Sequence, residues 1–346
     1  MSGFPGPPKP HCGEGASRTY NGVAMDFNLS TSQHDWQERA QAFARDLAPS
    51  AAADDIVAGA VRAKLVEARG DLLSAVVAVE AVAWESAGAA VALAMHVGVT
   101  MGLGETNVST ELAGGECVGA IALSSDEVPV VEQGSLSGRA SWVTPLTAHG
   151  LVIVGVREGD SLTAAAVRLD AGGVTQEPVA TAGLSGLVCG HVRFERTPFA
   201  AAGATQPFMA RARVLLAAAG LGMGRRALHE ALTVARGHRD RGAGGEQTVQ
   251  GLLADAATEL DAARMLTWKA ASAADMSLAD ASMAKLLATE ATQRAVARAT
   301  QIVGADSFRA GHIVERLAQD VRALELFAGR TEALRETVAL ETLPRS

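Results

Sequence analysis

The stretch of residues 282–335 carries the clearest information about the fold. It opens with SMAKLLATEATQRAVARATQ (residues 282–301) and passes through a glycine-bearing turn, IVGADSF (residues 302–308). It closes with ERLAQDVRALELFAGRTEALR (residues 315–335). Alanine, leucine, glutamate and arginine dominate both long segments, and these residue types have high intrinsic helix propensity. The stretch therefore predicts two long helices joined by a short turn.

Two further helical segments precede this stretch, and together they extend the pattern to the C-terminus. The expected helices cover residues 208–238, 246–276, 278–303 and 312–343, and all have alanine-rich faces. Long helices joined by short connections are typical of antiparallel bundles. We therefore expect residues 201–346 to form a C-terminal four-helix bundle.

The periodicity changes on the N-terminal side of the bundle. Short strand-like runs separated by Gly, Asp and Pro fill residues 118–200, which predicts a small middle β-domain. Helical periodicity fills residues 25–117 and predicts an N-terminal helical domain. Residues 1–24 are rich in Gly, Pro and Ser, and we expect a disordered tail there. The predicted fold class is α+β, mainly α.

Composition narrows the class of protein. The chain has 346 residues, 48% of them hydrophobic and 20% charged, which indicates a globular protein with a large core. A net charge of -8 argues against nucleic acid or an anionic membrane surface as the main partner. No apolar run reaches membrane-spanning length, so we expect no membrane insertion. Cys12, Cys117 and Cys189 lack metal-ligand spacing, so we expect no metal site and a reducing, cytoplasmic setting.

The order of these segments resembles the acyl-CoA dehydrogenase family. There the first helix reads AMAKLFASEAA, the turn reads Q-x-x-G-G-x-G-Y, and the close reads ER-x-x-RDA-x-x-x-x-IYEGTSEIQR. The resemblance implies FAD as cofactor, with α,β-desaturation of an acyl-CoA thioester as the activity, and so a role in lipid metabolism. The positions that coincide without a gap are Glu315, Arg316, Asp320, Gly329, Glu332 and Arg335.

The resemblance also implies a glutamate that removes a substrate proton, and both family positions for it are alanine here. Ala328 falls at one of them, and Ala212 falls at the other, in the run that matches the family's L-D-x-E-R pattern. Arg330 occupies the place of a small threonine. Glu325 lies one helical turn before Ala328 and is the remaining candidate base. The alternative is that Glu325 is simply a solvated helix residue.

A strand-like motif holds the best candidates for the flavin ring. GRASWVT (residues 138–144) resembles the family's NG-x-K-x-WIT strand. The resemblance implies that Trp142 covers one side of the ring and that the Thr144 hydroxyl reaches its polar edge. Ser124 falls in an upstream segment whose family counterpart contacts flavin. The alternative is that Trp142 caps the core of the β-domain.

The bundle holds the candidates for the flavin pyrophosphate. Arg236 matches the arginine of the family's R-x-x-FG element, and a guanidinium suits phosphate because its planar fork donates two hydrogen bonds. Gln247 lies in QTVQ, which matches FQ-x-VQ in the family. Gln301 and Gly304 preserve part of the Q-x-x-G-G-x-G turn, whose later glycines are replaced here.

Three functions remain open. The first is a flavoprotein subunit of a heteromer, in which a full-length acyl-CoA dehydrogenase homologue supplies the base and part of the flavin site. The second is an enzyme of the same fold with different chemistry on an acyl thioester, and the third is a non-catalytic scaffold subunit. Residues 48–70 leave little room for a further helix and a PEEYGG loop that wall the pockets in the family. The apolar helix faces predict a homo-oligomer or a heteromer.

Overall fold

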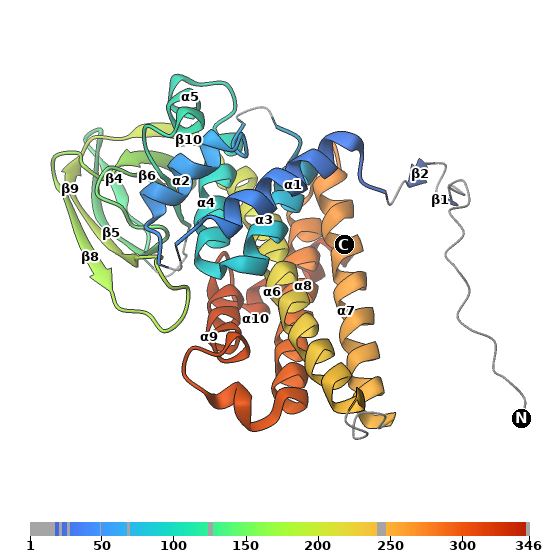
Figure 1. The fold of residues 1–346 in the computed structure, drawn as a ribbon. Helices are drawn as coiled ribbons and strands as arrows, with labels where there is room; N and C mark the ends of the chain where they lie inside the picture. The colour runs from blue at the N-terminus through green and yellow to red at the C-terminus, as the bar shows by residue number, and fades with distance from the viewer. Residues whose placement is uncertain are drawn as a thin grey trace, which may run out of the picture.

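The computed structural model places a β-sheet domain beside a bundle of long helices, with shorter N-terminal helices packed between and above them (Figure 1). This arrangement confirms the predicted α+β, mainly α fold class. The structure describes residues 18–20, 23–25, 28–48, 50–67, 70–123, 127–240 and 247–343.

The N-terminal part is helical after a short hairpin. Strands β1 (Arg18–Tyr20) and β2 (Val23–Met25) pair antiparallel, within and next to the segment where we expected disorder. The rest of that segment lies outside the described residues. The helices that follow are α1 (Thr31–Arg45), α2 (Ala53–Arg62), α3 (Leu72–Glu85), α4 (Ala87–Gly102) and α5 (Asn107–Gly114). Helix α5 is absent from the sequence-based expectation.

Helices α3 and α4 form the centre of the molecule because they are apolar on nearly every face. Almost every residue of α4 is buried, and Ser86 caps its N-terminus by accepting from the Ala89 amide. His96 of α4 accepts a hydrogen bond from the Gly119 amide at its Nδ1, over 3.0 Å. Burial lowers the pKa of His96 to about 4, so the ring stays neutral and can accept. This bond ties the sheet to α4.

The middle domain is one sheet that packs on both faces. Along β6, Leu151 and Ile153 point into the helical core, whereas Val152 and Val154 point into a second core within the β-domain. This alternation follows from the two-residue period of a strand. In the described part of the chain the eight strands are β3 (Gly119–Ala122), β4 (Val130–Glu132), β5 (Ser135–Val143), β6 (Leu151–Glu158), β7 (Ser161–Arg168), β8 (Val174–Val179), β9 (Cys189–Thr197) and β10 (Ala200–Gly203).

The strand order is β10-β7-β6-β4-β5-β9-β8, and β3 pairs with β6 off this path. Strands β3 and β4 run parallel to β6, and the other pairs are antiparallel. The β3 edge of the sheet packs on α4, so the sheet meets the helices there.

The C-terminal part begins with three long helices, α6 (Gln206–Asp240), α7 (Gln247–Ser272) and α8 (Leu278–Val303). Helix α6 lies against α3, α4, α7 and α8, so it connects the bundle to the N-terminal helices. Its Gly222 permits this close approach, because a Cβ there would lie 2.3 Å from the Glu80 carbonyl oxygen of α3.

The last predicted helix, residues 312–343, is wrong as a single element. After the short 3₁₀ helix η1 (Gly304–Phe308), the chain forms α9 (Ile313–Leu326) and a separate α10 (Thr331–Thr342). The break has a backbone cause: Ala328 has φ of 53° and Gly329 has φ of 110°, and neither value is compatible with a right-handed helix.

Candidate functional site

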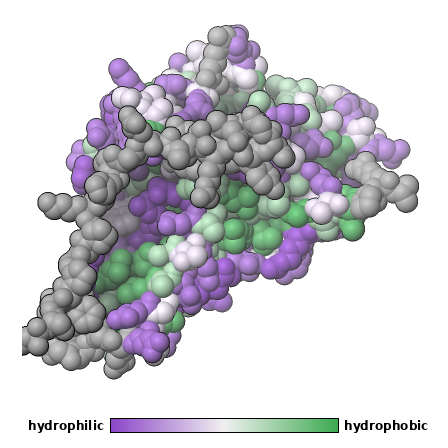
Figure 2. Space-filling view, turned by 90° about the vertical axis from the view of Figure 1, so that its right-hand side faces the viewer, coloured by the Kyte–Doolittle hydropathy of each residue, from purple (hydrophilic) through white to green (hydrophobic). Residues whose placement is uncertain are grey.

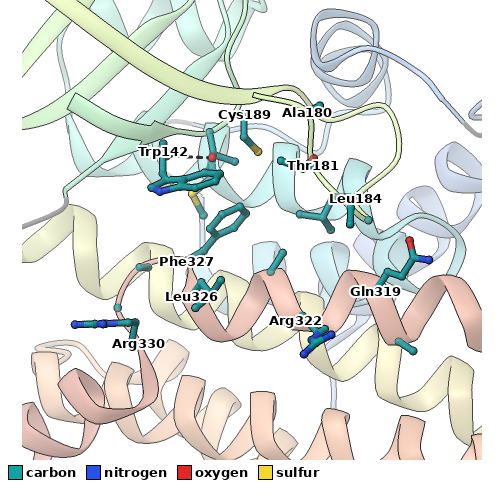
Figure 3. Close-up of a pocket in the computed structure, with 18 of the residues that line it drawn as sticks. Trp142, Ala180, Thr181, Leu184, Cys189, Gln319, Arg322, Leu326, Phe327 and Arg330 are labelled. Atoms are coloured by element: carbon teal, nitrogen blue, oxygen red, sulfur yellow. Dashed lines mark hydrogen bonds between the residues drawn. The ribbon is translucent and has the colours of Figure 1, made fainter. Parts of the chain in front are cut away.

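A cavity of about 1330 Å³ lies between the sheet and the bundle. One wall comes from β3, β5 and the loop at residues 180–184, and the opposite wall comes from α9 and the loop at residues 327–330 (Figure 3). Met95 of α4 and Met209 of α6 also line it. The cavity is therefore built by all three parts of the chain.

Trp142 supplies a flat aromatic surface on the sheet side. The β5–β9 pairing shifts register between Ala140 and Val143, and Trp142 lies inside this irregularity with φ of 58°. Such bulges re-aim a side chain, and the indole is 49% exposed rather than packed in the sheet. Its outer edge meets the ring of His191, with centroids 5.5 Å apart.

A hydroxyl lies two residues further along the same segment. Thr144 is nearly buried yet lines the cavity, and its Oγ1 donates to the Trp142 carbonyl over 3.1 Å. The opposite wall presents Phe327 and Leu326 at the end of α9 (Figure 3). The cavity therefore has an aromatic side with one polar group, facing an apolar side.

Helix α9 forms the floor through one of its faces. Glu315, Gln319 and Arg322 line the cavity at the three- and four-residue spacing of a helix. On a neighbouring face, Asp320 accepts from the Leu184 amide and fastens the 180–184 loop to α9. Burial raises the pKa of Asp320, and this hydrogen bond partly opposes that effect.

Two buried cations hold the loop at residues 327–330. Arg213 of α6 donates from Nε to the Ala328 carbonyl over 3.0 Å and from Nη1 to the Ser282 hydroxyl over 2.6 Å. Lys285 of α8 donates to the Gly329 carbonyl over 2.7 Å. Burial lowers the pKa of Lys285 to about 7, and the nearby Arg213 charge adds to this shift. Burial also lowers the pKa of Arg213, to about 10.

The sequence of this chain is similar to proteins of known family. The sequence profile of the acyl-CoA dehydrogenase C-terminal domain matches residues 202–343. The probable acyl-CoA dehydrogenase YngJ of Bacillus subtilis (strain 168) is 28% identical over 266 residues, which cover 70% of this chain and 68% of YngJ. The chain is thus similar to acyl-CoA dehydrogenases over most of its length, and its residues 202–343 match the C-terminal domain of that family.

Solved structures share the fold of this chain. Butyryl-CoA dehydrogenase from Megasphaera elsdenii superposes with a TM-score of 0.81 at 21% identity, over 92% of this chain and 100% of that one. The FAD complex of PigA superposes with a TM-score of 0.80 at 19% identity, over 92% and 99%. At these identities the likeness shows the fold alone. Several other curated relatives are matched over only 23% to 33% of their own length.

Within this family fold, the candidate base positions lie at the bundle side of the cavity. Ala328 lines the cavity, whereas Ala212 is fully buried and stands outside the lining formed by the described residues. Glu325 is half-buried and also stands outside that lining. Its carboxylate accepts from Gln293 Nε2 over 2.7 Å and from the Thr331 hydroxyl over 3.5 Å.

The candidate flavin residues divide into two groups. Trp142 and Thr144 lie together at the cavity. The pyrophosphate candidates are instead exposed and are not part of the cavity lining that the structure describes; they are Arg236, Gln247, Gln301 and Gly304. Ser124 lies outside the described residues.

Sequence reasoning did not identify the two cations behind the loop. Arg213 and Lys285 are distant from Ala328 along the chain, and helical periodicity alone marks both as ordinary helix residues. A signal was present in the quoted motifs, because Lys285 falls on the lysine of AMAKL and Arg213 on the arginine of L-D-x-E-R.

The described ranges contain no cluster of three or more His, Cys, Asp or Glu residues that could hold a metal ion. None of the helices in those ranges combines the length and the hydropathy needed to cross a bilayer.

Proposed function

We propose that this chain is a flavin-binding subunit of an acyl-CoA dehydrogenase-like heteromer. A full-length homologue would supply the catalytic base and part of the flavin site. The reaction would be α,β-desaturation of an acyl-CoA thioester, with electrons passing to FAD. The observation that carries the proposal is a large cavity with a half-exposed Trp142 on one side and Ala328 where a base would stand.

The residues present fit the ring end of FAD. An isoalloxazine has flat faces and a rim of hydrogen-bonding atoms, and Trp142 with Thr144 offers a matching surface and hydroxyl. Bound FAD would supply the hydride acceptor. Arg236, Gln247, Gln301 and Gly304 are exposed, which supports our proposal that they contact a flavin held by a neighbouring subunit.

The chain's own residues would bind and orient the acyl group. The cavity lining is mainly apolar and includes Ile121, Leu123, Leu184 and Leu326, which suits an acyl chain and excludes water. Proton removal needs a group within hydrogen-bond reach of the α-carbon. Glu325 accepts two hydrogen bonds outside the lining, which supports our proposal that the partner supplies that group.

The test is the visible spectrum of the chain purified alone and together with a full-length homologue. We expect a flavin spectrum in the complex, and we expect Trp142→Ala in this chain to weaken flavin retention there. Val188→Ala, which changes an exposed apolar residue just before β9 and outside the cavity lining, is the control. A complex that holds no flavin would contradict the proposal and favour a scaffold role.

The same experiment also tests the alternative that the chain is an enzyme of the same fold that needs no partner. If the lone chain retains flavin and oxidises an acyl thioester without a partner, the chain is an independent enzyme of the same fold. In that case its base is a residue other than those at the family positions.

A further inference from the structure

The loop at residues 327–330 is surrounded by an excess of positive charge. Arg213 is 6% exposed and Lys285 is 0% exposed, yet their hydrogen-bond acceptors are backbone carbonyls and a serine hydroxyl. Within the described ranges, neither cation donates a hydrogen bond to a carboxylate, although the Glu325 charge acts on Lys285 and partly opposes the lowering of its pKa. Arg213 is therefore a buried charge without a paired carboxylate, whereas Lys285, with a pKa of about 7, carries only part of a charge at neutral pH and lies within the influence of Glu325.

The cavity side of the same loop adds further cations. Arg322 and Arg330 line the cavity, and the structure shows no hydrogen bond or ion pair from either guanidinium to another described residue. Figure 3 shows them at separate places along the lower wall. The carboxylate that lines the cavity in the described chain is that of Glu315, and it accepts from Gln319. Guanidinium groups therefore outnumber carboxylates in the lining.

A buried cation without a counter-ion is unfavourable, because transfer from water costs several kcal/mol and neutral partners recover only part of it. Arg213 keeps its Nη2 free of any hydrogen bond to the described residues, and this guanidinium lies next to Gly329. The short side chain of Ala328 lines the cavity next to Arg213, so no long side chain at position 328 fills that part of the cavity.

We propose that the cavity binds the carboxylate of an aliphatic ligand beside Ala328, paired with Arg213 and Arg330. A carboxylate matches the planar fork of a guanidinium through two parallel hydrogen bonds. The apolar body of the ligand would lie along Leu326, Phe327 and Met209. The ligand is either a free carboxylic acid or an acyl thioester that carries a second carboxylate.

Carboxylate binding does not depend on flavin binding, because the charges and the cavity belong to this chain alone. A chain that holds no flavin can still bind a carboxylate, and a flavin-binding chain can fail to do so. The two proposals therefore fail separately.

The first experiment is calorimetric titration of the full chain with matched ligands. Butyrate should bind, and its neutral isostere butyramide should not. The N-acetylcysteamine thioesters of glutaric and butyric acid differ in one carboxylate. If the glutaryl thioester binds more tightly than butyrate, the ligand is an acyl thioester with a second carboxylate rather than a free carboxylic acid. Equal binding of butyrate and butyramide, no binding of any carboxylate, or tighter binding of inorganic phosphate would overturn the proposal.

The second experiment assigns the site. Arg330→Thr should weaken butyrate binding about tenfold, the effect of one charge-assisted hydrogen bond. The matched control is Arg157→Thr, because Arg157 is exposed on β6 and stands outside the cavity lining of the described chain. Equal losses in the two variants would show that net charge, rather than this site, binds the ligand.

The third experiment uses position 328 itself. Ala328→Glu places a carboxylate beside Arg213, and Ala328→Gln places a side chain of the same size without charge. Both variants share the same backbone strain, so their difference isolates the charge. We expect the Glu variant to melt about 2–4 °C above the Gln variant, and neither to bind butyrate. Equal melting temperatures, or retained butyrate binding in the Glu variant, would contradict an anion site here.

Discussion

Ala328 has a backbone conformation that alanine seldom adopts. Its φ of 53° lies in the left-handed region, which costs roughly 1 kcal/mol or more for a residue with a Cβ. The hydrogen bonds from Arg213 and Lys285 to the carbonyls of Ala328 and Gly329 fix this conformation from behind. The shape of the loop is therefore set by two side chains that are remote in the sequence.

Lys285 makes stability depend on pH. Its pKa falls from 10.5 in the unfolded reference to about 7 in the folded chain, so the folded state binds fewer protons between these values. Folded stability therefore rises with pH across that window, by up to about 1.4 kcal/mol per pH unit. Lys285→Met should remove this rise.

Urea unfolding at about pH 7, 8 and 9 measures the effect. Lys269→Met is the control, because Lys269 is 54% exposed and pairs with Asp280 at the surface. If wild type and the Lys285 variant gain stability equally with pH, Lys285 is not buried as a low-pKa amine.

At the scale of elements, α6 and α3 approach too closely for any side chain at Gly222. Gly222→Ala should lower the free energy of unfolding by about 1–3 kcal/mol, because the new methyl group would force the two helices apart. Gly251→Ala in α7 meets no atom within 4 Å, and it should instead stabilise the chain by about 0.5–1 kcal/mol.

Equilibrium urea unfolding of the two glycine variants gives the comparison. We expect the free energy of unfolding to fall in the Gly222 variant and to rise in the Gly251 variant. A Gly222 variant as stable as wild type would mean that the α3–α6 contact is looser than the structure indicates.

Most long elements could be predicted from the sequence because their periodicity is strong. Helices α3, α4, α6, α7 and α8 all follow runs of small apolar residues. The short strands could not be predicted from the sequence. Strand β8 contains Pro178 and its buried and exposed residues alternate only weakly, and β10 is a four-residue strand of Ala and Gly. Their pairing depends on β9 and β7, which are the neighbours that the fold provides.

The break between α9 and α10 was also beyond sequence reasoning. FAGR at residues 327–330 contains no proline, and alanine and arginine favour helix. The break is stabilised by donors from α6 and α8, so it arises from tertiary contacts. The same limit applies to the site, where the aromatic side at Trp142 was found from a local motif and the cation pair behind Ala328 was not.

At the scale of the whole molecule, apolar surface remains uncovered. Figure 2 shows the face that lies on the right of Figure 1, where hydrophobic residues gather in a hollowed region bordered by hydrophilic ones. Among the described residues, Phe308 is 91% exposed, and Leu340 and Leu343 are 62% and 65% exposed. Patches of this kind mark contact surfaces.

We therefore expect an oligomer. Light scattering at micromolar concentration should give a mass of at least twice the 35.4 kDa of one chain. A single monodisperse species of monomer mass would contradict this expectation, whether the chain is purified alone or with its homologue.

We propose that this chain shapes a cavity for flavin and an acyl group but lacks its own catalytic base. Anaerobic addition of an acyl-CoA thioester tests it most directly, with loss of flavin absorbance as the signal. The complex with a full-length homologue should bleach, and the same complex should lose that activity when the homologue's catalytic glutamate is changed to glutamine. The lone chain supplied with FAD should bleach at least about 10²-fold more slowly, the usual cost of losing a general base. Rapid bleaching by the lone wild-type chain would contradict the account.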